Sequence, residues 1–214
     1  MIFTIIQTII LAITAGIVLW YTIETHRLRK ETVKQTEKLH QANAFTTLTA
    51  IHERLTNRVS YEIRGYLLTN FANDLAKVTT SVLGAQCVTN KAGADRVDVD
   101  KVKSLQKDKN MLHKFTKELR ACQTLVPNVN ALEVVEWTLL DFDVIALPIW
   151  MGIEPAKEVA RAYKPVLERT AEEIIPFVAI HQQLRGDPKY KMHYLYLLRE
   201  LHISLRGLEV YDDT

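Results

Sequence analysis

Cysteine and glycine are both scarce in this chain. Among its 214 residues only Cys87 and Cys122 are cysteines, they lie far apart, and neither has a histidine at a zinc-ligand spacing. A disulfide framework and a zinc site are therefore not supported, and a reduced, cytoplasmic setting fits best. The 7 glycines form no glycine-rich loop of the kind that cradles phosphate groups.

An excess of charge of one sign is also lacking. The chain has 27 Lys and Arg against 25 Asp and Glu, a formal net charge of +2. Proteins that bind nucleic acids usually carry a strong positive excess, so we do not expect nucleic acid as a partner. After about 22 residues are assigned to a membrane helix, the remaining length suits one domain with a core of its own.

The chain opens on a long segment without charge. No Asp, Glu, Lys or Arg lies between Ile2 and Ile23, and most positions there are aliphatic or aromatic. Such a run is long enough to cross a hydrocarbon core of about 30 Å as one helix. Trp20 and Tyr21 then fall where an interfacial belt of aromatic residues is expected. We therefore predict a transmembrane anchor over residues 1–23.

Flanking charge predicts the orientation of this anchor. No Lys or Arg precedes it, whereas Arg27, Arg29 and Lys30 follow it closely. By the positive-inside rule the N-terminus lies outside the cell (inner) membrane and the C-terminal domain lies in the cytoplasm, with the lipid bilayer as a partner. Two alternatives stay open: a cleaved secretory signal, which normally has basic residues before a shorter apolar stretch, and a helix buried in a core.

Composition divides the rest of the chain into two parts. Residues 24–43 are rich in Lys, Glu, Gln and Thr, which predicts a solvated helical stalk that continues the anchor. The heptad positions of the stalk are too polar for a stable coiled coil. Residues 44–214 carry apolar side chains at helical spacing, without a strand-like alternation. We predict an all-α fold made of the anchor, the stalk and a cytoplasmic helical bundle.

The first half of this domain shows three amphipathic helical patterns separated by polar residues. The spacing predicts helices over 45–68, from 71 to 84 or 87, and over 99–122, with a loop at 89–100 and a stop at Pro127.

Caps and prolines mark the helices of the second half. Asn130 followed by Glu133 is typical of a capping arrangement, and it opens a strongly apolar helix that Pro148 and Gly152 close. Pro155 lies in the first turn of the next helix.

The remaining proline and glycine residues predict two further helix boundaries. Pro165 and Pro176 are expected to kink or split the helical span that follows Pro155. Gly186 is expected to end this span, Asp187 to cap a final helix and Pro188 to be the first residue of that helix. Apolar positions at helical spacing then continue to about residue 208.

Four segments of the second half form a recognisable set. They are Leu140 to Ala146, Gly152-Ile153-Glu154, Pro176, and Arg185 to Tyr190. With these motifs, residues 130–205 resemble an uncharacterised family of small bacterial and archaeal single-pass membrane-anchored helical proteins, known as a domain of unknown function. The anchor and the basic stalk match the family's layout, while Pro148 and the polar insert at 90–100 depart from it. The resemblance implies architecture, because the family offers no established catalytic residues.

Motifs for metal binding and catalysis are sparse. Glu37 and His40 have the Glu-x-x-His spacing that places two ligands on one helical face, but a di-metal site needs a second such motif and further carboxylates. Asp141 and Asp143 lie in an apolar helix, where a carboxylate either reaches a helix edge or needs a partner such as an arginine. We predict no catalytic set, no metal and no cofactor, and we expect the chain not to be an enzyme.

A mixed basic and aromatic segment begins at Arg185. This mixture favours either contact with a nucleotide-like ligand or, more commonly, an amphipathic helix with tyrosines at its boundary. The candidate contacts for a small-molecule ligand or a partner are Asp141, Asp143, Arg185, Lys189, Tyr190 and Lys191.

Two functions from different classes follow from this pattern. The leading interpretation is a non-enzymatic interaction or scaffold module, held at a membrane, that binds a protein partner or forms a homo-oligomer. The alternative is a ligand-gated membrane effector, for example in antiviral defence, that senses a small anionic, nucleotide-like signal through its basic segment. An enzyme is the third interpretation.

Overall fold

A computed structural model describes residues 2–56, 58–91 and 93–204 of the chain. Helices dominate these residues, which confirms the all-α prediction in its coarse form. The chain divides into two compact units, Met1–Thr46 and Thr47–Thr214. The second unit holds the packed core.

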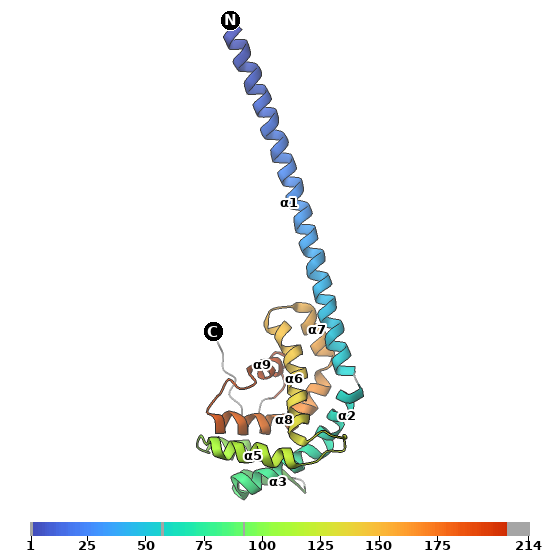
Figure 1. Cartoon of the computed structure of the whole chain (residues 1–214), viewed down its shortest axis with the longest axis vertical. Coiled ribbons are helices and arrows are strands. Elements are labelled where there is room, and N and C mark those ends of the chain that lie inside the picture. Colours follow the sequence, from blue (N-terminus) through green and yellow to red (C-terminus); the bar gives the residue numbers. More distant parts are fainter. Residues whose placement is uncertain (1, 57, 92, 205–214) are drawn as a thin grey trace. The chain divides into compact units, whose positions relative to one another are not determined.

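The helices and strands follow one another closely along the chain (Figure 1). The α-helices are α1 (Ile2–Thr56), α2 (Arg58–Tyr66), α3 (Ala72–Leu83), α4 (Val99–Lys103), α5 (Lys109–Ala121), α6 (Ala131–Trp150), α7 (Glu154–Ala162), α8 (Lys164–Arg185) and α9 (Met192–Glu200). The other elements are the π-helical turn η1 (Leu67–Phe71), the 3₁₀ turn η2 (Ala85–Cys87), and the strands β1 (Val88–Lys91) and β2 (Ala94–Val97).

Helix α1 contains the segments predicted as anchor and stalk. Within the described part of the chain, none of the helices combines the length and the apolar character that a membrane crossing requires. The anchor predicted over 1–23 includes Met1 and the side chains of residues 2–10 and 12, which lie outside the described part. The described side chains give this anchor no support, so the anchor and its orientation stay predictions.

Two helix ends in the second unit follow the predicted local chemistry. The Asn130 side chain accepts a hydrogen bond from the backbone N–H of Glu133, and the Glu133 carboxylate accepts one from the N–H of Asn130, both at 3.0 Å. Helix α6 therefore opens with a complete capping box. Gly186 ends α8 in the left-handed region at φ 63°, where a Cβ would also collide with the Lys107 side chain.

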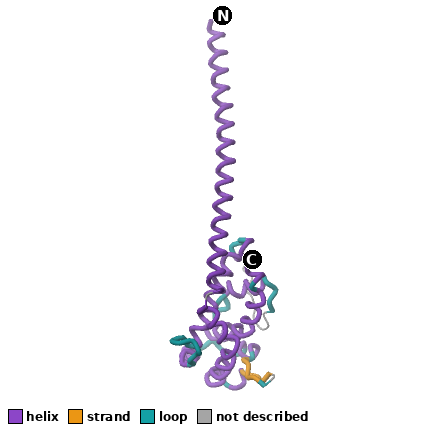
Figure 2. Tube along the Cα trace, turned by 90° about the vertical axis from the view of Figure 1, so that its right-hand side faces the viewer, coloured by secondary structure: helices purple, strands orange, loops and turns teal. Residues whose placement is uncertain are grey.

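Residues 88–97 contain a β-hairpin where the sequence predicted a loop. Strands β1 and β2 pair antiparallel, with Val88 opposite Val97 and Thr89 opposite Arg96. Strands of four residues are too short to show a clear alternation of polar and apolar side chains, so the pattern resembled a loop. The hairpin, drawn in orange in Figure 2, packs against α3.

The helix predicted over 99–122 is in fact two helices, α4 and α5. The Asp108 carboxylate accepts hydrogen bonds from the N–H groups of Asn110 and Met111, at 2.8 and 3.0 Å, and so caps a new helix. Asp98 caps α4 in the same way. The apolar spacing continues across the break, and it concealed the boundary. The helix predicted over 45–68 is likewise divided among α1, α2 and η1.

Prolines interrupt the helices less than predicted. Pro148 lies inside α6, which continues to Trp150, and Pro176 lies inside α8. Pro165 does mark a boundary, because it occupies the first turn of α8 directly after α7 ends. The burial of Pro148 shows that packing holds the helix together where one backbone hydrogen bond is lost.

The last helix begins later than predicted. Asp187 accepts a hydrogen bond from the Lys189 N–H at 3.1 Å within a turn, and Lys191 adopts a left-handed conformation at φ 62° before α9 starts at Met192. Asp187 and Pro188 therefore belong to a turn and not to the start of the helix. The four residues after α9 are not helical, and the predicted continuation over 205–208 lies outside the described residues.

Aromatic side chains hold α6, α8 and α9 in place. The rings of Phe142 on α6 and Tyr194 on α9 stack with centroids 5.5 Å apart. Phe71 of η1 meets Phe177 of α8 edge to face at 6.4 Å. All four side chains are fully buried. This packing fixes α8 beside η1 and so sets the position of the charged side chains that α8 carries.

Candidate functional site

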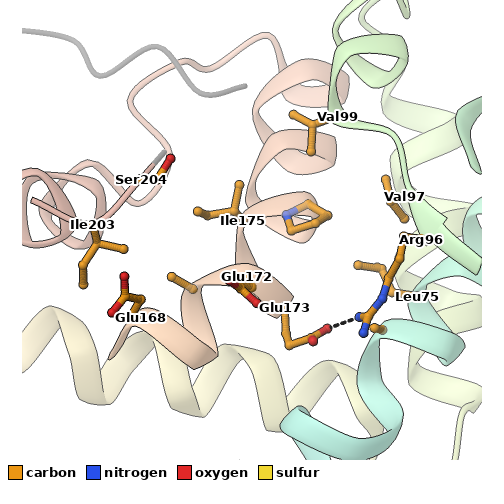
Figure 3. A pocket seen from close by; sticks show the side chains of 13 residues that line it. Leu75, Arg96, Val97, Val99, Glu168, Glu172, Glu173, Ile175, Ile203 and Ser204 are labelled. Carbon is orange, nitrogen blue, oxygen red and sulfur yellow. Dashed lines mark hydrogen bonds and ion pairs between the residues drawn. The ribbon is translucent and has the colours of Figure 1, made fainter. Parts of the chain in front are cut away.

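A pocket of about 600 Å³ lies between α3, α8 and the segment from β2 to the start of α4. Figure 3 shows its charged side chains gathered near apolar ones. The apolar part of the lining includes Leu75, Val97, Ile175 and Ile203. The pocket therefore offers both charge and apolar surface to a ligand.

Three carboxylates come from one stretch of α8. Glu168, Glu172 and Glu173 line the pocket. Glu168 and Glu172 are four residues apart and share the exposed face of α8, while Glu173 is turned about 100° from Glu172 and is buried. Like charges four residues apart destabilise a helix slightly, so this arrangement does not serve the stability of α8. Among the described residues, neither Glu168 nor Glu172 forms an ion pair.

Arg96 is the one cationic side chain among the described residues of this lining. Pairing of β2 with β1 positions Arg96, and its guanidinium donates to the Glu173 carboxylate at 2.5 Å. Glu173 is 9% exposed, and this burial raises its pKa, while the guanidinium of Arg96 opposes the rise. Because Arg96 already forms an ion pair with Glu173, the carboxylates of Glu168 and Glu172 are the ones that can contact a ligand.

The pocket is suited to binding a cation with an apolar body. Among the described lining residues there are three carboxylates and one guanidinium, a formal charge of −2 when all are ionised. Carboxylates bind ammonium and guanidinium groups through charge-assisted hydrogen bonds. No histidine, cysteine or lysine lies among the described lining residues.

The residues predicted as ligand or partner contacts lie elsewhere in the second unit. The structure brings Asp143 and Lys191 together, with their charged atoms 2.8 Å apart. The Arg185 guanidinium lies over the Tyr190 ring, 4.4 Å from its centroid. In each contact, two of the predicted residues interact with each other: Asp143 with Lys191, and Arg185 with Tyr190. A role for any of these residues in ligand binding stays a prediction.

Two other predicted contact residues are also accounted for. Burial lowers the pKa of Arg64, and the negative charge of Asp141 raises it by a smaller amount. Arg64 is the partner that an aspartate in an apolar helix needs. Lys189 is exposed, beside the turn that Asp187 forms.

The residues predicted at a membrane interface all lie on α1. The rings of Trp20 and Tyr21 meet edge to face at 5.6 Å, and Arg27 forms an ion pair with Glu31 at 3.5 Å. Arg29 and Lys30 are exposed. These facts fit either a membrane interface or a solvated helix.

A metal site has no support among the described residues. No three His, Cys, Asp or Glu side chains in this part of the chain lie close enough to hold an ion. The side chain of His40, the second half of the Glu-x-x-His motif, is not among those that the structure describes. The prediction that the chain binds no metal therefore stays a prediction.

Sequence reasoning missed the pocket residues Arg96, Glu168, Glu172 and Glu173. The usable signal was the pair Glu172-Glu173 within an otherwise apolar stretch of α8. Its partner Arg96 lies 77 residues away, on a hairpin that was predicted as a loop, so the sequence does not connect the two.

No protein-family model, curated protein or solved structure matches the chain. The resemblance to a family of membrane-anchored helical proteins therefore stays a prediction.

Proposed function

We propose that this chain is a non-enzymatic binding module, held at a membrane by residues 1–23, whose helical domain binds a cationic group of a partner. The pocket between α3, β2 and α8 carries the proposal, because Glu168 and Glu172, which pair with none of the described basic residues, add negative charge to an apolar wall. A lysine or arginine side chain of a protein partner has the matching chemistry, a cation on an apolar stem.

The membrane part of the proposal comes from sequence. Residues 2–23 carry no charge and a cluster of basic residues follows them, which supports a helical domain on the cytoplasmic side. A tether of this kind raises the local concentration of the module near partners that share the membrane. Alkaline extraction of cell membranes should leave the full chain in the pellet. Release of the chain into the supernatant would remove this part of the proposal and leave the pocket untouched.

The pocket is tested with a small probe of the proposed chemistry. Hexylguanidinium combines a cation with an apolar chain, while hexanoate and hexanol share the chain and differ in charge. Calorimetric titration of the full chain should show binding of hexylguanidinium and little of the other two. Glu168→Gln/Glu172→Gln should weaken this binding up to about fivefold, since an exposed ion pair contributes at most about 1 kcal/mol. Equal binding of all three probes would contradict the proposal.

A further inference from the structure

The described part of the chain ends at the rim of the pocket. Ile203 and Ser204, which follow α9, both line it. Ile203 is buried, and its N–H donates to the Leu198 carbonyl at 2.9 Å, so the point where the chain reaches the pocket is fixed to the core. In Figure 3 both residues lie across the pocket from Arg96, on the side of Glu168. The residues that follow Ser204 therefore start beside a carboxylate that does not pair with Arg96.

Residues 205–214 supply the chemistry that the pocket is proposed to bind. Arg206 is the one basic residue in this stretch of sequence, and it lies between Leu205 and Leu208. Its side chain is a cation on an apolar stem, which matches carboxylates set in an apolar wall. Two residues of extended chain span up to about 7 Å, and the arginine side chain extends this reach. Arg206 can therefore enter a pocket whose rim is formed by Ser204.

We propose that Arg206 occupies the pocket of its own chain, with its guanidinium at the carboxylates of Glu168 and Glu172, and that the cation of a partner binds by displacing it. The inference rests on the proposed function, because it names a competitor for the same site. A group tethered this closely has an effective concentration of about 1 mM or more. Even the weak ion pairs of exposed carboxylates then fill the pocket for part of the time.

The charge of the remaining segment keeps this contact weak. Glu209, Asp212 and Asp213 follow Arg206, and the described lining of the pocket has a formal charge of −2. Like charges repel, so the acidic residues oppose docking of the segment as a whole, and Arg206 alone has the sign that the pocket attracts. A weak contact within the chain suits a site that a partner has to open, because displacing it lowers the partner's affinity only by the fraction of pockets that are closed.

Competition with hexylguanidinium tests the contact. Calorimetric titration of the full chain in a non-ionic detergent compares the native chain with Arg206→Ala. The variant should bind the probe about threefold more tightly or better, since it leaves every pocket open. Lys117→Ala removes one positive charge from an exposed position on α5, outside the pocket, and as the matched control should bind like the native chain. Arg206→Lys keeps a cation on an apolar stem and should stay close to the native affinity.

Two further measurements locate the effect in the pocket. In a Glu168→Gln/Glu172→Gln background, Arg206→Ala should change the affinity for the probe much less, because the carboxylates that hold Arg206 are gone. Without any probe, Arg206→Ala should move the methyl signals of Val97 and Ile175, which line the pocket, and Lys117→Ala should leave them in place.

The outcomes separate this inference from the proposed function. Equal affinity of the native chain and Arg206→Ala for the probe, with the pocket methyl signals unmoved, would overturn the inference and leave cation binding by the pocket intact. Arg206 would then pair elsewhere, for instance with the acidic residues of its own segment. An equal gain in affinity with Lys117→Ala would assign the effect to net charge and would also overturn it. If none of these proteins binds the probe, the proposed function is wrong and the inference fails with it.

Discussion

The imidazole of His181 stacks on the ring of Tyr190, with centroids 5.2 Å apart and an angle of 18° between the planes. Phe177 lies on the same imidazole at 4.2 Å. His181 is completely buried, and neither ring nitrogen has a hydrogen-bond partner among the described residues. Burial lowers the pKa of His181 to about 3, with a smaller contribution from the Arg185 charge. The histidine therefore acts as a neutral aromatic ring inside the core.

This environment predicts a loss of stability in acid. The folded pKa of His181, about 3, lies below the unfolded value of 6.5, so the unfolded chain takes up a proton first as the pH falls. The contribution of His181 is fully present above pH 6.5 and is lost progressively toward pH 3, on the order of 5 kcal/mol in all. His181→Phe should remove this part of the pH dependence and raise the free energy of unfolding near pH 7 by about 1 kcal/mol. Urea unfolding of both proteins from pH 7 to pH 4 measures it, and identical slopes against pH would refute it.

Arg96 is predicted to stabilise the domain through Glu173. Arg96→Met leaves a nearly buried carboxylate without its partner, and should lower the free energy of unfolding by about 2 kcal/mol. The deficit should shrink as the pH falls, because a protonated Glu173 no longer needs the guanidinium. Arg96→Met/Glu173→Leu is the matched control and should recover most of the loss in chemical denaturation. A double variant as unstable as the single one would show that Arg96 acts through other contacts.

Two buried tyrosines should respond differently to loss of the hydroxyl. The Tyr66 hydroxyl donates to Asp74 at 2.5 Å, whereas the Tyr194 hydroxyl has no hydrogen-bond partner among the described residues. Tyr66→Phe should therefore cost about 1–2 kcal/mol of unfolding free energy. Tyr194→Phe should change it by less than about 0.5 kcal/mol, since only an unpaired polar group is removed. Thermal unfolding followed by circular dichroism compares the pair, and equal shifts would contradict the assignment.

The capping box of α6 is predicted to be worth about 1 kcal/mol. Asn130→Ala removes the side-chain acceptor for the Glu133 N–H and should lower the free energy of unfolding by that amount. Asn110→Ala, at an exposed position in the first turn of α5, serves as the control and should have little effect. The two variants are compared by urea denaturation, where similar losses would argue against a specific cap.

Local chemistry explains which features the sequence predicts well. Asn130 and Glu133 are three residues apart, and Gly186 acts on its own helix end, so each can be recognised without knowledge of the fold. The break before Asp108 is also local, but a continuous apolar spacing conceals it.

The pocket depends on contacts that are distant in sequence. Arg96 meets Glu173 because β2 packs on α3 and leads directly into α4, which packs on α8. The predicted contacts Asp143 and Lys191, in turn, satisfy each other, since a charge inside the bundle is most easily held by a neighbouring opposite charge. Sequence pattern shows neither pairing in advance.

Binding of a cationic group in the pocket is tested most directly by a methyl chemical-shift map of the full chain, labelled at isoleucine and valine, during titration with hexylguanidinium. The methyl signals of Val97, Val99 and Ile175, which line the pocket, are expected to move together and saturate, while that of Val144 on α6 stays in place. Shifts that centre on any other part of the domain, or none at all, would contradict the claim that this pocket binds a cationic group.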